Sequence, residues 1–78
     1  MDGKPLKISE LPVSDSRKAM LGYLGSARTI AEVCAKFNKS YAWVSQENAI
    51  MRARGWIVRA ESMSAMKRWK LDPKEVVP

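Results

Sequence analysis

The feature that most constrains this chain is an alternation between residues that begin helices and residues that end them. The side chains that can cap a helix N-terminus are Ser14, Thr29 and Ser40, and the residues that can end a helix are Gly25, Asn38 and Gly55. Glu32 follows Thr29 by three residues, which completes a capping box. These signals predict three helices, at about 15–24, 30–37 and 41–54.

Apolar residues repeat with helical spacing in these segments. The first stripe is Met20, Leu21 and Leu24, and the second is Ile30, Val33, Cys34 and Phe37. In the third segment Asn48 lies between Val44 and Met51, where an apolar residue is expected. A buried Asn48 needs hydrogen-bond partners or costs about 1–3 kcal/mol. Alternatively, the helix is rotated and Asn48 belongs to a functional surface.

Two segments rich in strand-forming residues follow. Residues 56–60 and 66–71 would pair as an antiparallel hairpin joined by 61–65. The joining residues contain no Gly, Asn or Pro, so the alternative is a helix over 61–70. We expect the tryptophans of the two strands to close the core and the methionines to fill it; these residues are Trp56, Trp69, Met20, Met51 and Met66.

The two ends of the chain carry weaker signals. Residues 1–13 contain two prolines and are expected to form an arm or an edge strand, pinned to the body by Leu6, Ile8 and Leu11. Asp72 and Pro73 are expected to end regular structure, which leaves 74–78 as a frayed tail. The predicted organisation is an arm at 1–13, a domain at 14–71 and a tail at 72–78.

Length and charge narrow the function. A chain of 78 residues holds one domain and is too short for a Rossmann fold or a TIM barrel. Its net charge of +6 favours a polyanionic partner such as nucleic acid. The excess gathers at residues 52–70, where six cations face only Glu61, a local charge of +5; the cations are Arg52, Arg54, Arg59, Lys67, Arg68 and Lys70.

The sequence lacks the residues that several kinds of site require. The chain has no His and a single cysteine, Cys34, so imidazole catalysis, histidine-containing zinc sites and an internal disulfide are excluded. It shows no nucleophile–base pair, carboxylate dyad or glycine-rich phosphate loop, so we expect no enzyme, no metal and no cofactor. One free thiol, and no apolar run of about 20 residues or signal-peptide stretch, predict a cytoplasmic protein away from membranes.

One run of motifs resembles a known family. The residues from Thr29 to Phe37, then Ser40, then Val44–Ser45, then Gly55 to Ile57 with Arg59, are similar to the winged helix-turn-helix domains of bacterial and phage regulators. The resemblance covers about 17–71 and implies a mainly α fold: three helices plus an antiparallel hairpin, the wing. It implies sequence-specific binding of double-stranded DNA by a small transcriptional regulator related to phages or mobile elements. Such a domain is expected to act as a homodimer through the arm, the first helix or the tail.

The resemblance also assigns residues to the DNA. The third helix would lie in the major groove and expose Ser40, Tyr41, Ala42, Ser45, Gln46 and Ala49. Gln46 is the candidate for pairing with adenine, and Ala42 for contact with a thymine methyl group. Ser40 and Tyr41 would contact phosphates at the helix start. The wing would add Arg59, Lys67 and Arg68 at the backbone or minor groove. Trp43 would either pack against the second helix or lie near the DNA.

Trp43 and two features of charge favour a different function. Glu47 adds a negative charge beside the proposed groove face, and the third helix has no Arg or Lys before Arg52. Both are unusual for a helix that reads DNA. The alternative is a protein-interaction module of the same fold, which binds and inhibits another protein.

Overall fold

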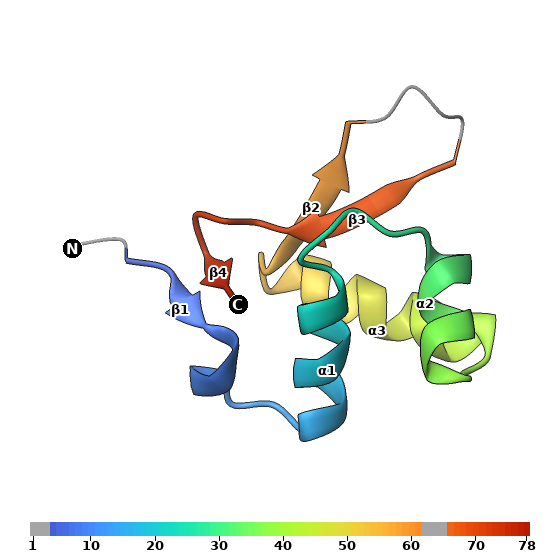
Figure 1. Cartoon of the computed structure of the whole chain (residues 1–78), viewed down its shortest axis with the longest axis horizontal. Helices are drawn as coiled ribbons and strands as arrows, with labels where there is room; N and C mark the ends of the chain where they lie inside the picture. Colours follow the sequence, from blue (N-terminus) through green and yellow to red (C-terminus); the bar gives the residue numbers. More distant parts are fainter. Residues whose placement is uncertain (1–3, 62–65) are drawn as a thin grey trace.

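A computed structural model describes residues 4–61 and 66–78. In chain order the elements are strand β1 (Leu6–Lys7), the 3-10 helix η1 (Ile8–Glu10), helices α1 (Asp15–Tyr23), α2 (Ile30–Phe37) and α3 (Tyr41–Ala53), and strands β2 (Ile57–Ala60), β3 (Arg68–Leu71) and β4 (Val76–Val77). The three helices pack together, and the β2–β3 hairpin extends away from them (Figure 1). The predicted α+β fold of three helices and an antiparallel hairpin is confirmed.

The helices begin and end at the predicted signals. Thr29 and Glu32 form the capping box, with the Thr29 N–H donating to Glu32 Oε1 over 2.8 Å and the Glu32 N–H donating to Thr29 Oγ1 over 3.1 Å. The Ser40 hydroxyl accepts from the Trp43 N–H at 3.2 Å and caps α3. Asn38 and Gly55 adopt left-handed backbone, with φ of 55° and 78°, and so end α2 and α3. Local signals therefore determine both ends of α2 and α3, and the start of α1, where the Ser14 hydroxyl accepts from the Arg17 N–H at 3.3 Å.

The hairpin also follows the prediction. Strands β2 and β3 pair antiparallel, with Ile57 opposite Leu71 and Arg59 opposite Trp69. The alternative of a helix over 61–70 is wrong, because its C-terminal part belongs to β3. Residues 62–65 of the predicted connection lie outside the described residues. A further bridge joins β3 to the segment before α2: Arg28 N–H donates to Trp69 O at 2.9 Å, and Trp69 N–H to Arg28 O at 2.8 Å.

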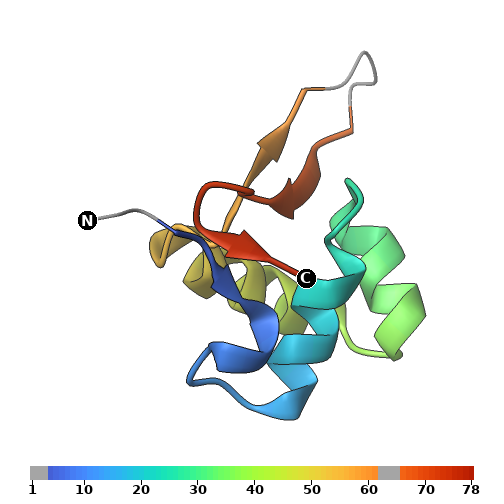
Figure 2. The ribbon, with the colours of Figure 1, turned by 60° about the vertical axis from the view of Figure 1, so that its left-hand side comes forward.

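The two ends of the chain pair with each other. Strands β1 and β4 lie parallel, with Leu6 opposite Val76, and Figure 2 shows them side by side. The predicted frayed tail is therefore wrong: Val76 is 1% exposed and belongs to the core. The predicted edge strand near the N-terminus is confirmed. Ile8 and Leu11 pin it to the body, whereas Leu6 is 48% exposed.

One apolar core joins the helices to both sheets. Its buried residues are Ile8, Leu11, Met20, Leu21, Leu24, Val33, Val44, Met51, Ile57, Leu71 and Val76. Trp56 and Trp69 are half-buried and pack against this core, as predicted. Met66 is 54% exposed, so its predicted place in the core is wrong; it precedes β3 and lies far along the hairpin. Within the described part of the chain, no helix has the length and apolar character needed to cross a lipid bilayer.

Candidate nucleic-acid interface

Helix α3 turns one face to the core and the opposite face to solvent. Val44 and Met51 are each 1% exposed. Ala42, Gln46 and Ala49 lie on the exposed face, which carries short, uncharged side chains at the positions that the helical period predicts. At the start of the helix, Ser40 and Tyr41 are exposed as well, and Ser45 is half-buried at the edge of the face.

Trp43 packs against the apolar core, while its nearness to DNA stays a prediction. Its half-buried ring lies against the core, and the Lys39 ammonium is 5.2 Å from the ring centroid. The ring also borders a hollow of about 650 Å³ together with Leu11, Pro12 and Val13. Trp43 is therefore a boundary residue between the core and this hollow.

Glu47 does not lie beside the exposed face of α3. It is 7% exposed and forms a bidentate ion pair with Arg17 of α1, at 2.6 Å from Nε to Oε1 and 3.2 Å from Nη2 to Oε2. The hydrogen bond and the charge of this carboxylate raise the pKa of the Arg17 guanidinium. The charge that counted against DNA binding is compensated inside the fold, where it joins α3 to α1.

Asn48 is buried and has a partner. It is 4% exposed, and its Oδ1 accepts a 2.7 Å hydrogen bond from Nε of Arg52. The Arg52 guanidinium carbon lies 4.7 Å from the centroid of the Trp69 ring. Helix α3 is thus not rotated away from the core, and Asn48 serves to hold an arginine. Arg52 was not among the residues expected to contact DNA; its position one helical turn after Asn48 was the available signal.

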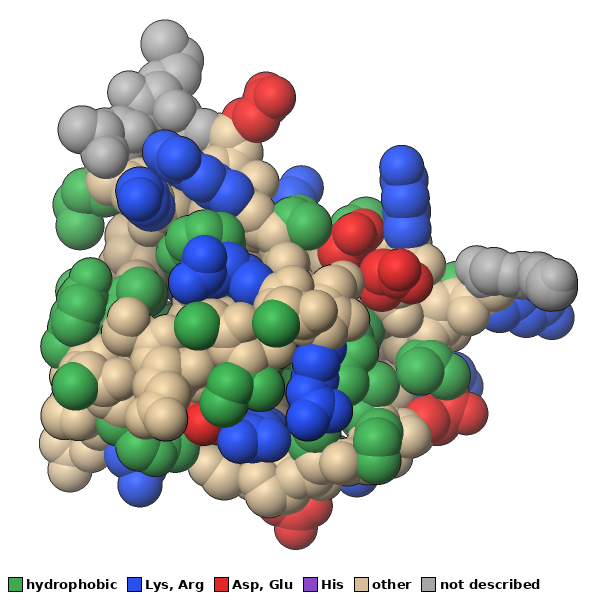
Figure 3. All heavy atoms as spheres, turned by 180° about the vertical axis from the view of Figure 1, so that it is seen from behind, with side chains coloured by type: hydrophobic (Ala, Val, Ile, Leu, Met, Phe, Trp, Pro, Cys, Tyr) green, Lys and Arg blue, Asp and Glu red, His purple; other side chains and the backbone are tan. Residues whose placement is uncertain are grey.

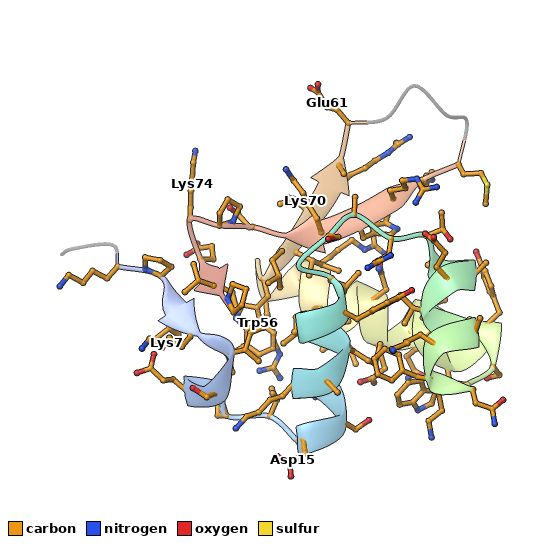
Figure 4. All side chains as sticks on the ribbon, in the orientation of Figure 1. Lys7, Asp15, Trp56, Glu61, Lys70 and Lys74 are labelled. Carbon is orange, nitrogen blue, oxygen red and sulfur yellow. The ribbon has the colours of Figure 1, made fainter. Side chains whose placement is uncertain are left out.

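The cations of the hairpin differ in their exposure and in whether a carboxylate compensates their charge. Arg59 and Lys67 are exposed, whereas Arg68 is half-buried and pairs through Nη1 with Glu32 Oε1 at 2.8 Å. Arg68 therefore joins β3 to the start of α2, and its charge is largely compensated. Lys70 points away from the helices (Figure 4). On the face opposite that of Figure 1, Lys and Arg side chains lie along the hairpin and across the helices beneath it (Figure 3).

The Glu32 carboxylate makes the stability of the fold depend on pH. Its pKa is lowered, first by the Thr29 backbone N–H and also by the nearby charge of Arg68, against the opposing effect of desolvation. Because the folded-state pKa is below the unfolded one, the carboxylate stabilises the fold above the unfolded pKa, and this contribution is lost as the pH falls through the folded pKa.

We expect Glu32→Gln to lower the thermal unfolding midpoint at neutral pH, and the difference from the wild type to shrink below about pH 4. Thermal melts at several pH values measure this. Glu61→Gln is the control, since the Glu61 side chain points into solvent (Figure 4). If the difference in unfolding midpoint between variant and wild type stays constant down to pH 3, the charge of Glu32 contributes nothing to stability.

Comparisons with family models, with curated proteins and with solved structures found no match to this chain.

Proposed function

We propose that this domain binds double-stranded DNA, with α3 in the major groove and the β2–β3 hairpin against the phosphate backbone. The observation that carries the proposal is the exposed, uncharged face of α3 together with the exposed hairpin cations Arg59 and Lys67, which pair with no carboxylate among the described residues. An α-helix of about 10–12 Å diameter fits the major groove, which is about 12 Å wide. Ala42 and Ala49 let the helix approach the base edges closely.

The proposed contacts divide into two kinds. Gln46 reads a base, because its amide can donate and accept toward one adenine. Ser40 and Tyr41 at the start of α3, with Arg59 and Lys67 on the hairpin, contact phosphates and fix the register of the helix. Arg68 contributes less, because Glu32 already compensates its charge. The domain fits the resemblance to winged helix-turn-helix regulators.

A single module of this size gives limited affinity, so we propose a homodimer on two half-sites, as the resemblance to phage and mobile-element regulators implies. The free thiol of Cys34 supports a reducing, cytoplasmic setting. In this setting the protein would act as a small transcriptional regulator.

Fluorescence anisotropy with a labelled mixed-sequence duplex, over a salt series of about 50 to 200 mM, tests the proposal. Each phosphate that is neutralised should contribute about −0.9 to the slope of log affinity against log salt. Binding should therefore be measurable at low salt and weaken steeply as salt rises. Absence of salt-sensitive binding to any duplex would count against DNA as the partner.

We expect Gln46→Ala to relax the preference at one base pair by roughly 1–3 kcal/mol. Selection of bound sequences from a random DNA pool, with the wild type and the variant, measures this preference. The salt slope serves as the control and should not change, because Gln46 carries no charge. Recovery of the same motif by both proteins would remove Gln46 from the base contacts.

The alternative is a protein-interaction module, and the hollow beside Trp43 favours it. This hollow of about 650 Å³ combines Leu11, Pro12 and Val13 with the half-buried indole ring. It lies at the junction of α1 and α3 and does not include the free cations of the hairpin. If duplex DNA fails to bind in the salt series, this surface becomes the leading candidate.

A further inference from the structure

A groove lies between α3 and β3 at the start of α2. Its volume is about 500 Å³, and Tyr41, Ser45, Asn48, Arg52, Lys67 and Trp69 contribute to its walls. The described residues that line it include two cations and no carboxylate. We call it the α3–β3 groove. Besides the apolar side chains of Ile30, Ala31 and Met66, its lining provides hydroxyl groups, an amide and positive charge. These polar groups suit an oxyanion.

Arg52 is held in place at this groove from two sides. Its Nε donates to Asn48 Oδ1 at 2.7 Å, and its guanidinium stacks on the ring of Trp69, 4.7 Å from the centroid. Asn48 is 4% exposed, so the acceptor that holds the arginine is itself fixed in the core. Among the described residues, no carboxylate pairs with Arg52.

This arrangement leaves the two Nη groups as an oriented pair of donors. A guanidinium presents its N–H groups in a planar fork that matches the oxygens of a phosphate. Because Nε and the plane of the group are already fixed, the side chain loses less conformational entropy when it binds. The groove therefore offers a prepared donor in Arg52, a residue that was not among those expected to contact DNA.

We propose that the α3–β3 groove is a phosphate-binding site, with the Arg52 fork as its main donor and Lys67 as a second cation. The hydroxyl groups of Tyr41 and Ser45 provide further donors on the same wall. A backbone phosphodiester of DNA and a free phosphate have the same oxyanion chemistry. The assignment of the bound phosphate to DNA rests on the proposed function, whereas the assignment of the groove as an oxyanion site does not.

The proposal explains why an asparagine occupies a core position of α3. A leucine there would pack in the same volume and would leave Arg52 without its acceptor. We therefore expect Asn48→Leu to fold and to weaken phosphate binding, although residue 48 is too buried to be the main contact. Arg52→Lys keeps the charge and removes both the fork and the Nε–H.

The matched control is Arg54→Lys. Arg54 is also stacked on a tryptophan, with its guanidinium carbon 5.3 Å from the centroid of the Trp56 ring, and it does not line the groove. We expect Arg52→Lys and Asn48→Leu each to weaken duplex binding roughly tenfold, the loss expected for one charge-assisted hydrogen bond. Arg54→Lys should stay within about twofold of the wild type. Circular dichroism confirms that each variant is folded.

A nuclear magnetic resonance titration separates the two sources of phosphate. The Arg52 Nε–H and Trp69 Nε1–H signals of the wild type are followed with sodium phosphate, with a duplex, and with sodium chloride at equal ionic strength. Shifts with phosphate and duplex, and not with chloride, are the expected result. Shifts with phosphate alone would keep the site and overturn the DNA proposal. The site is refuted if the duplex binds and both groove variants have the same affinity as Arg54→Lys. It is also refuted if neither ligand shifts the Arg52 Nε–H signal.

Discussion

We expect Val76→Asp to lower the free energy of unfolding by about 4–6 kcal/mol, because it removes a buried valine side chain and places a carboxylate in the core. Val76 is 1% exposed, although only two residues follow it in the sequence. A domain of 78 residues has a total stability of about 4–12 kcal/mol. The substitution should therefore unfold a large fraction of the protein at room temperature.

Urea titration followed by tryptophan fluorescence measures this loss. Val77→Asp is the matched control, since it makes the same change at the next position of β4, where the side chain is only half-buried. We expect a clearly smaller loss from Val77→Asp. Equal stability of the two variants would mean that β4 does not close the core.

The second large effect concerns DNA. We expect the double variant Arg59→Ala with Lys67→Ala to bind every duplex more weakly and with a shallower salt slope. If each side chain neutralises one phosphate, the slope changes by about 2 and the affinity falls roughly 50-fold at about 0.1 M salt. Anisotropy titrations over the salt series measure both quantities.

The control for this prediction removes the same charge elsewhere. Lys70 and Lys74 both point away from the helices (Figure 4), so Lys70→Ala with Lys74→Ala should leave the affinity within about threefold. If the two double variants weaken binding equally, only the net charge of the domain matters. The hairpin would then have no specific place on the backbone.

Much of the fold could be predicted because its signals are local. The ends of α2 and α3 depend on residues that are close in sequence. These are the capping box of Thr29 and Glu32 and the left-handed residues Asn38 and Gly55. The strand formers after Gly55 predicted the hairpin in the same way. The end of the chain was missed because Val76 is buried by Leu6 and the core, partners that no local pattern identifies.

The candidate site was likewise predictable only where its signals are local. The helical period placed Ala42, Gln46 and Ala49 on the exposed face of α3. It could not reveal which charges are free, because the compensating partners are distant in sequence: Glu47 pairs with Arg17 across 30 residues, and Arg68 with Glu32 across 36. Such ion pairs depend on how the elements pack together, so only the three-dimensional arrangement identifies them.

Backbone amide chemical shifts of the labelled protein, recorded while a duplex is added at low salt, test the central claim most directly. We predict that the shifts gather at Ala42, Gln46 and Ala49 on α3 and at Arg59 and Lys67 on the hairpin. Residues of β1 and β4 should stay unchanged. Shifts confined to β1, β4 or the hollow beside Trp43, or no shifts at all, would contradict the assignment of α3 and the hairpin as the DNA-binding face.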